Sequence, residues 1–346
     1  MKKIYSDILQ FRGSHYDLGF KHGKQIKDSL IYENRLKQWR LRKPRFSIDV
    51  IETKRVFMQY APKIWEELEG MQEAMELPME DILRDFGGYR MQAPRSGCSV
   101  FTGKDYMIRN YDYHPKTYEG RYLIYQPNDG GYAVIGPTQR VTGRMDGMNE
   151  KGLAMGYNSI HRKKPKSGLI CHMIGRILLE TCANVEDAIH LLNDIPHRHS
   201  FSYILLDSNE ETVIVEASPR GIDTRKSNVC TNHFEINKEE NRKLLDDSYQ
   251  RLEAMKNHQD DIKDGYQAFR MMNDTDKGVF SKEYKNWAGT IHTSAYFPKE
   301  KKVWFALGGD TEPITFHFEE WLQGENFRTN RVFGNIDTNL KFAHMD

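Results

Sequence analysis

The chain has 346 residues, of which 38% are hydrophobic and 29% charged, and its formal net charge is +1. A disordered chain would have fewer apolar residues and a larger net charge, so this composition predicts a folded protein with a sizeable core. The small net charge gives no overall electrostatic basis for binding nucleic acid or an anionic membrane surface.

The first residues contain two lysines but no apolar segment of the kind found in a signal peptide. No apolar run approaches the ~20 residues that a membrane span needs, so we expect a cytoplasmic protein. The cysteines are widely spaced and form no C-x-x-C pair, which argues against a zinc ribbon and a disulfide framework. We expect Cys171, Cys182 and Cys230 to be reduced residues of the core.

The part of the chain before Cys98 has helical periodicity and no strong strand pattern. Helices are predicted at residues 16–39, at residues 48–75, and from Pro78, expected at the first helical position, towards Phe86. A basic cluster lies on and after the first helix and comprises Arg35, Lys37, Arg40, Arg42, Lys43 and Arg45. Such a cluster is most often a solvated helix face, and a patch for a polyanion or coenzyme A is the alternative.

From Cys98 onwards the pattern changes to short strands that alternate with helices. Strands are predicted at residues 98–102, 106–110, 122–126, 132–135, 152–157, 201–206, 212–217, 229–231, 291–297 and 303–307. Helices are predicted at residues 168–182, 184–192, 238–255 and 262–272. Periodicity alone therefore predicts a mixed α and β fold, with its sharpest break at Gly97-Cys98.

Cys98 is the candidate nucleophile, because Arg109 and Asp112 follow it closely in the sequence. A nucleophilic cysteine needs a cation that favours the thiolate and a base that carries protons. If the Gly97-Cys98 bond is cleaved, the new α-amino group has a pKa near ~7.7–8 and can be that base. Glycine at position 97 suits cleavage, since it tolerates strained backbone angles. A buried structural cysteine is the alternative for a Gly-Cys pair considered alone.

Gly97-Cys98-Ser99, together with the segment R-N-Y-D at 109–112, resembles the start of mature enzymes of the N-terminal nucleophile hydrolase superfamily. The resemblance is closest to the acyl-coenzyme A:isopenicillin N (6-aminopenicillanic acid) acyltransferase family and to the related choloylglycine hydrolase/penicillin V acylase family. Residues 146–154 resemble the D-G-x-N-E-K-G-L-A segment of these families, and residues 231–234 resemble their T-N-H-F segment. Residues 12–19 with Gly23 resemble the opening of the acyltransferase propeptide.

The resemblance implies an α+β fold, a four-layer αββα sandwich with a helical N-terminal leader. Residues 1–97 would be the leader, a propeptide-like segment packed on the body, and residues 98–346 the catalytic domain. Catalysis would use Cys98 as nucleophile and its α-amino group as base. Asp112 would orient the amine, while Arg109 supports the thiolate and Asp112. Asn232 and a backbone N–H near Asn158 would hold the oxyanion.

The implied activity is that of an amidohydrolase or acyltransferase that acts on a linear N-acyl amide or an acyl-CoA through an acyl-thioester. No metal or redox cofactor is implied, the partner would be a small molecule, and a homo-oligomer is possible. Choloylglycine hydrolases carry a late arginine that residues 289–295 lack. The resemblance therefore does not extend to bile-salt or penicillin V specificity, and it leaves the roles of His292 and Ser294 open.

Two alternatives remain at the level of sequence. One is a thiol hydrolase that is never cleaved, in which His114 or His292 is the base. The other is a catalytically inactive binding protein that keeps the same fold.

Overall fold

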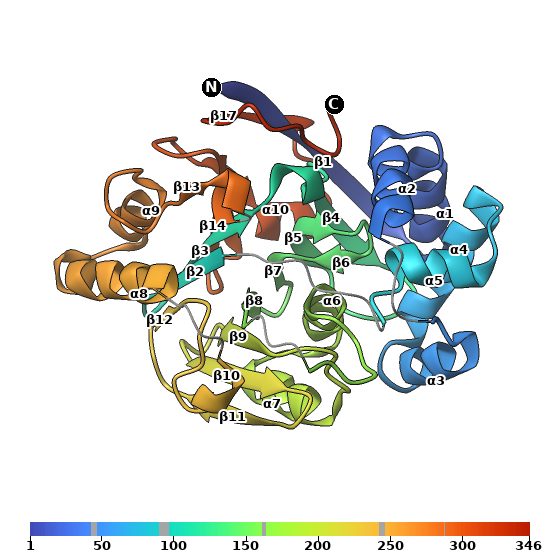
Figure 1. The fold of residues 1–346 in the computed structure, drawn as a ribbon, viewed down its shortest axis with the longest axis horizontal. Coiled ribbons are helices and arrows are strands. Elements are labelled where there is room, and N and C mark those ends of the chain that lie inside the picture. Colours follow the sequence, from blue (N-terminus) through green and yellow to red (C-terminus); the bar gives the residue numbers. More distant parts are fainter. Residues whose placement is uncertain (43–46, 90–96, 161–163, 242–245, 287) are drawn as a thin grey trace.

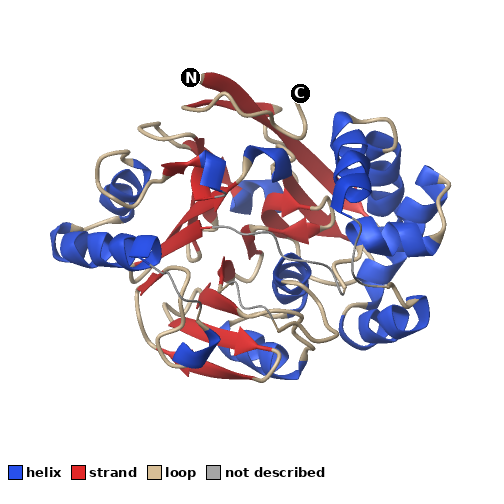
Figure 2. Cartoon of the chain, viewed as in Figure 1, coloured by secondary structure: helices blue, strands red, loops and turns tan. Residues whose placement is uncertain are grey.

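The computed structural model describes residues 1–42, 47–89, 97–160, 164–241, 246–286 and 288–346, without the side chains of residues 38–42. Strands occupy the middle of the molecule, helices α1 to α5 gather on one side, and α8 and α9 lie on the opposite side (Figures 1 and 2). None of the helices in these residues is long and apolar enough to cross a bilayer.

The first element is a strand, β1 (Lys2–Gly13), so the expectation of a leader without a strand is wrong. It pairs parallel with β4 (Arg121–Pro127) and antiparallel with β17 (Arg331–Ile336), which places both ends of the chain in the same sheet. Alternate residues of its first half, Ile4, Ser6 and Ile8, are buried, as period-2 geometry requires. This alternation is short and contains a serine, which makes it a weak signal in the sequence.

Five helices follow β1, and they divide the two long helices predicted from periodicity. They are α1 (His15–Ile26), α2 (Leu30–Arg42), α3 (Val50–Tyr60), α4 (Pro62–Met75) and α5 (Met79–Phe86). Pro62 starts α4 and ends α3, because proline fits the first turn of a helix but not its interior. Pro78 lies at the N-cap of α5, one position before the predicted one.

Helices α1 and α4 pack with their backbones in close contact. A Cβ atom added to Gly19 would lie 1.9 Å from the carbonyl oxygen of Glu67, and one added to Gly70 would lie 2.2 Å from that of Tyr16. Only glycine fits at these two positions, which gives Gly19 of the segment 12–19 a packing role.

The described strands form two sheets. The larger has the order β11-β10-β9-β8-β7-β5-β4-β1-β17, with β6 on β5, and the smaller has the order β12-β2-β3-β14-β15-β16, with β13 on β14. The remaining bounds are β2 (Gly97–Thr102), β3 (Met107–Tyr113), β5 (Val134–Gln139), β6 (Gly143–Arg144), β7 (Asp146–Asn149), β8 (Ala154–Ser159), β9 (Phe201–Leu206), β10 (Thr212–Ser218), β11 (Gly221–Arg225), β12 (Val229–Cys230), β13 (Lys282–Glu283), β14 (Ala288–Phe297), β15 (Lys302–Leu307) and β16 (Ile314–His317). The mixed α and β fold and both predicted hairpins are confirmed.

Buried apolar side chains form three clusters. One lies between the larger sheet and helices α1 to α7, where α6 is Cys171–Thr181 and α7 is Val185–Asp194. A second lies between the two sheets, with α10 (Phe318–Leu322) at its edge, and contains Cys98. The third lies between the smaller sheet and helices α8 (Asp246–His258) and α9 (Gly265–Asn273). The cysteines predicted to be reduced core residues, Cys171, Cys182 and Cys230, are buried and unpaired.

Candidate active site

Cys98 lies at the start of β2, paired antiparallel with β3, and only 1% of the residue is exposed. Cys98 is opposite Tyr111 in this register, and Gly97 is opposite Asp112. Successive side chains of a strand point to opposite faces. Arg109 therefore lies on the face of β3 that Tyr111 occupies, towards the larger sheet, and Asp112 lies on the other face.

The guanidinium of Arg109 contacts the candidate nucleophile directly. Its Nη2 donates to Cys98 Sγ at 3.3 Å and to the Tyr157 carbonyl oxygen at 2.7 Å. Its Nη1 donates to Asp146 Oδ1 at 3.1 Å, and both side chains of this ion pair are fully buried. A Cβ atom on Gly156 would lie 2.8 Å from Arg109 Cδ, so the glycine leaves room for the arginine.

Asp146 is a site residue that the sequence analysis did not single out. Its Oδ2 accepts a hydrogen bond from the Tyr296 hydroxyl at 2.7 Å, while Oδ1 binds Arg109. Asp146 opens the D-G-x-N-E-K-G-L-A segment at the start of a buried strand. A carboxylate at a buried position needs a cationic partner, and this is the signal that would have found it.

The thiol of Cys98 is not ionised at neutral pH in this environment. Burial raises its pKa to about 11, although Arg109 acts in the opposite direction. Arg109 alone therefore does not produce a thiolate, and a base is needed to remove the proton.

The side chain of Asp112 lies next to the backbone of Gly97. Its Oδ1 accepts a hydrogen bond from Thr290 Oγ1 at 2.7 Å, and its buried Oδ2 has no hydrogen-bond partner among the described residues. A Cβ atom on Gly97 would lie 3.4 Å from this Oδ2. Burial raises the pKa of Asp112 to about 7, opposed chiefly by Arg251.

Arg109 is expected to support Asp112, and its positive charge does lower the pKa of that carboxyl, but its side chain lies on the opposite face of β3. The arginine that forms an ion pair with Asp112 is Arg251, whose Nη1 lies 3.8 Å from Asp112 Oδ2. The physical reason is strand geometry, since two residues three apart in β3 point to opposite faces.

Asn232 contacts the backbone of the candidate nucleophile. Its Oδ1 accepts a hydrogen bond from the Cys98 backbone N–H at 2.8 Å and another from Arg251 Nη2 at 2.9 Å. Its Nδ2 donates to the Ser159 carbonyl oxygen at 2.9 Å. One amide hydrogen of Asn232 is thus engaged, and the second is available to another acceptor.

Asn158 lies in β8 and binds the backbone of the two residues before Asn232. Its Nδ2 donates to the carbonyl oxygens of Cys230 at 3.0 Å and Thr231 at 3.2 Å. The Asn158 amide therefore positions the T-N-H-F segment.

Arg251 of α8 is the second site residue that the sequence analysis missed. Its Nη1 donates to the Cys98 carbonyl oxygen at 2.8 Å and to Ser99 Oγ at 2.7 Å, and only 4% of its side chain is exposed. The same guanidinium binds Asp247, one turn earlier in α8, at 2.8 Å. Arg251 lies on the buried stripe of α8 formed by Ser248, Arg251, Leu252 and Met255. Its place in that helical period is the signal that would have found it.

The two histidines considered as bases have other contacts. His114 caps a short helical turn, with Nδ1 accepting from the Lys116 backbone N–H at 3.1 Å. His292 stacks on Tyr111 with ring centroids 4.9 Å apart, and its Nε2 lies 3.5 Å from Asp146 Oδ1. Burial lowers the pKa of His292 although Asp146 opposes it, which leaves the ring neutral at pH 7.

Ser294 lies in β14 opposite Arg109. Among the described residues, no group of histidine, cysteine and acidic side chains is placed to hold a metal ion.

Comparisons with known proteins identify a family for this chain. The family model described as acyl-coenzyme A:6-aminopenicillanic acid acyl-transferase matches residues 100–312, which is more than half of the chain. No curated protein matches the chain.

Several solved structures are similar. Penicillin V acylase from Agrobacterium tumefaciens has 16% identity and a TM-score of 0.45 over 63% of this chain and 84% of its own. A mutant of the conjugated bile acid hydrolase from Clostridium perfringens has 14% identity and a TM-score of 0.43, over 71% of this chain and 98% of its own. The Caenorhabditis elegans ortholog of N-acylethanolamine-hydrolyzing acid amidase has 14% identity and a TM-score of 0.42, over 59% of this chain and 93% of its own.

The family assignment is based on the family model, which begins two residues after Cys98 and spans the strands and helices that surround it. The chain belongs to the acyl-coenzyme A:6-aminopenicillanic acid acyltransferase family, a family of acyl-transferring enzymes.

Proposed function

We propose that the chain is an N-terminal cysteine amidohydrolase or acyltransferase that forms an acyl-thioester on Cys98. Its substrate would be a small molecule, either a linear N-acyl amide or an acyl-CoA. One observation carries the proposal: the two reactive atoms of Cys98 have different partners. Sγ faces the guanidinium of Arg109, while the backbone nitrogen donates to Asn232 Oδ1 beside Asp112.

Processing would begin with attack of Cys98 Sγ on the carbonyl carbon of Gly97. The C–N bond breaks, a thioester joins Gly97 to Sγ, and the thiol proton is transferred to the freed nitrogen. Water then hydrolyses the thioester, which releases a Gly97 carboxylate and regenerates the thiol. Asp112 lies beside this bond, and its pKa of about 7 suits a group that gives and takes protons near neutrality.

In turnover, Sγ would attack the acyl carbonyl of the substrate, and the α-amino group would pass the proton to the leaving amine. Water or an acceptor amine then takes the acyl group from the thioester. The second amide hydrogen of Asn232 Nδ2 is the donor we assign to the oxyanion, with a backbone N–H near Asn158. Loss of one such donor typically costs about 10²–10³ in rate.

The three apolar clusters support a four-layer arrangement in which the two sheets lie between two layers of helices. Under this proposal residues 1–97 are a propeptide-like leader and residues 98–346 the catalytic domain. The leader would stay bound after cleavage, because β1 is hydrogen-bonded between β4 and β17 of the body.

Intact mass under denaturing conditions tests the proposal. The wild-type chain should give two fragments, one beginning at Cys98, and should turn over at least one N-acyl amide or acyl-CoA. Cys98→Ala should give one mass and no turnover. The matched control is Cys182→Ala, which removes a buried cysteine from the end of α6. Unchanged turnover in Cys98→Ala would refute the whole assignment.

A single uncleaved mass combined with turnover that depends on Cys98 would point to the histidine-based thiol hydrolase. His292→Gln would then be the decisive variant, because His292 lies against Tyr111, the cross-strand neighbour of Cys98.

A further inference from the structure

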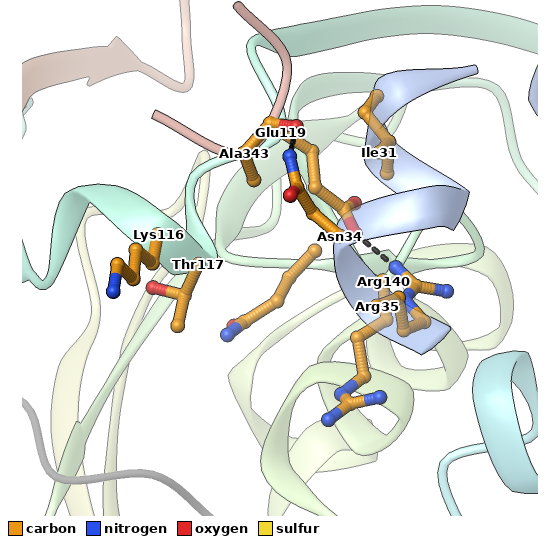
Figure 3. A pocket seen from close by; sticks show the side chains of 9 residues that line it. Ile31, Asn34, Arg35, Lys116, Thr117, Glu119, Arg140 and Ala343 are labelled. Atoms are coloured by element: carbon orange, nitrogen blue, oxygen red, sulfur yellow. Dashed lines mark hydrogen bonds and ion pairs between the residues drawn. The ribbon is translucent and has the colours of Figure 1, made fainter. Parts of the chain in front are cut away.

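A small polar cavity lies where α2, the β3–β4 connection and the end of β5 meet the C-terminal residues (Figure 3). Its volume is about 50 Å³, and its polar lining includes Asn34, Arg35, Lys116, Thr117, Glu119 and Arg140. One water needs about 10–15 Å³ of such a cavity, so this one has room for a few waters or for one tetrahedral oxyanion. We propose that the cavity binds a small oxyanion, a phosphate or carboxylate group.

The charges in the cavity are not balanced. Glu119 forms an ion pair with Arg35, and its second oxygen accepts from the Val141 backbone N–H at 2.9 Å. Both oxygens of the one carboxylate among the residues that line the cavity therefore already have partners. Figure 3 shows the dashed ion pair between Arg35 and Glu119, and Arg140 is near because both arginines donate to the Asp85 carbonyl oxygen.

Arg140 is the side chain to which we assign the anion as counterion. Its hydrogen bond within the described part of the chain is a long one, from Nη1 to the Asp85 carbonyl oxygen at 3.5 Å. Arg35 donates to the same carbonyl at 3.1 Å, so the two arginines share one weak acceptor. Burial, and then Arg35, lower the pKa of Arg140 to about 10. Arg140 is half-buried, and no carboxylate of the described residues forms an ion pair with it. An oxyanion between the two guanidinium groups would supply this counterion.

The backbone at Arg140, beside the cavity, is strained. Arg140 and Val141 have φ angles of 53° and 67°, in the left-handed region that non-glycine residues rarely adopt. The Arg140 carbonyl oxygen accepts from the Thr142 backbone N–H at 2.8 Å, which holds the bend. Strain of this kind persists where the surroundings demand it, and it is frequent at ligand sites.

The cavity is separate from the nucleophile. Gln139 lines it and donates to the Tyr113 hydroxyl at 3.3 Å, and Tyr113 stacks on Tyr111, the cross-strand neighbour of Cys98. Two aromatic rings and an amide thus lie between the cavity and the thiol. The anion would instead connect Arg35 of the leader to Arg140 of the body.

Thermal unfolding of the full chain, titrated with inorganic phosphate and separately with acetate at constant ionic strength, tests the proposal. We expect a saturable rise in Tm with at least one anion, and the anion that gives it identifies the group as phosphate or carboxylate. Arg140→Asn should weaken the apparent affinity at least about tenfold, since it removes a charge-assisted hydrogen bond. Asparagine tolerates left-handed backbone, so this variant keeps a residue suited to the bend.

The control is Lys277→Gln, which removes one exposed positive charge from the loop after α9 and should keep the wild-type response. General stabilisation by phosphate would be linear in concentration and equal in all variants. A linear rise of that kind, the absence of any rise, or a saturable rise that Arg140→Asn retains would each overturn the proposal. Cys98→Ala should respond as the wild type does, which separates this site from the proposed function.

Discussion

At the scale of single residues, the candidate site is divided by β2 into two halves. Cys98 Sγ lies with Arg109 and Asp146 on one face, and the Cys98 backbone lies with Asn232, Asp112 and Arg251 on the other. The N-terminal nucleophile that we propose would need both halves, because its thiol would attack and its nitrogen would carry the proton. Arg109 therefore contacts the thiol, while Arg251 contacts the Cys98 carbonyl oxygen and the Asn232 oxygen that binds the Cys98 nitrogen.

The first prediction at this scale concerns Arg251. Arg251→Gln should lower kcat/KM by about 10–10²-fold, since it removes charge-assisted hydrogen bonds to Cys98 and Asn232. It should also move the acidic limb of the pH profile to higher pH. Arg251 lowers the pKa of Asp112, and the same positive charge would keep the nearby amine deprotonated.

Measurement of kcat/KM against pH for wild type, Arg251→Lys and Arg251→Gln provides the check. Arg251→Lys keeps the positive charge but not all the hydrogen bonds. Its pH profile should therefore be close to that of the wild type, while its kcat/KM should stay below the wild-type value. Arg270→Gln is the control, since Arg270 pairs with Glu312 at the surface of α9. An acidic limb that does not move in Arg251→Gln would contradict this role.

The second prediction concerns Asp112 and stability. Its pKa is raised from 3.8 to about 7, so the folded chain binds more protons than the unfolded chain between these values and loses stability as pH rises. Asp112→Asn avoids this loss. The free energy of unfolding of Asp112→Asn minus that of its parent should therefore be roughly 2–3 kcal/mol larger at pH 8 than at pH 5.

Urea unfolding at both pH values, with Cys98→Ala as the common parent to prevent processing, measures this difference. Thr290→Val is the control, because it removes the hydrogen bond to Asp112 and leaves the carboxyl in place. An equal effect of Asp112→Asn at the two pH values would show that the carboxyl titrates near its usual pKa.

At the scale of elements, α1 and α4 pack with their backbones in direct contact. Gly19→Ala would place a methyl group against the Glu67 backbone, where a Cβ atom would lie 1.9 Å from the carbonyl oxygen. Backbone cannot move aside as a side chain does, so the two helices must separate. We expect a loss of about 1–3 kcal/mol or more in the free energy of unfolding.

Denaturant unfolding of Gly19→Ala against Lys24→Ala, an exposed position of the same helix, checks this prediction. The lysine variant should stay within about 0.5 kcal/mol of wild type. Similar unfolding midpoints for the two variants would mean that the helices tolerate separation.

At the scale of the whole molecule, buried ion pairs connect residues 1–97 to the rest of the chain. Glu67 of α4 binds Arg176 of α6 at 2.8 Å, with both side chains fully buried. His15 of α1 lies 3.2 Å from Glu180 of α6. Arg35 of the basic cluster pairs with Glu119, so the expectation of a solvated helix face is wrong for this residue. Lys37 is exposed, as expected, while the side chains of Arg40, Arg42, Lys43 and Arg45 lie outside the described residues.

If cleavage occurs, the two fragments should therefore elute together on gel filtration without denaturant. Glu67→Gln should weaken their association, since breaking one side of a buried pair costs about 3–5 kcal/mol. Glu33→Gln is the matched control, because Glu33 pairs with Lys37 at the surface of α2. Elution of a separate leader from the wild-type chain would contradict the prediction.

The sequence by itself determined the mixed α and β fold and most strand positions. These features depend on local periodicity and on turn residues, which act between neighbours in the chain. It also determined the family, because Cys98, Arg109, Asp112 and Asn232 stand in recognisable segments.

Only the tertiary structure decided which of these residues meet. The strand β1 depends on pairing with β4 and β17, far along the chain, and its own alternation is short. The pairing of Arg109 with Asp146, and of Arg251 with Asp112, depends on which face of β3 each side chain occupies and on how α8 packs against β2. Such contacts join residues that are distant in sequence, and a buried charge takes whichever partner the packed layers place beside it.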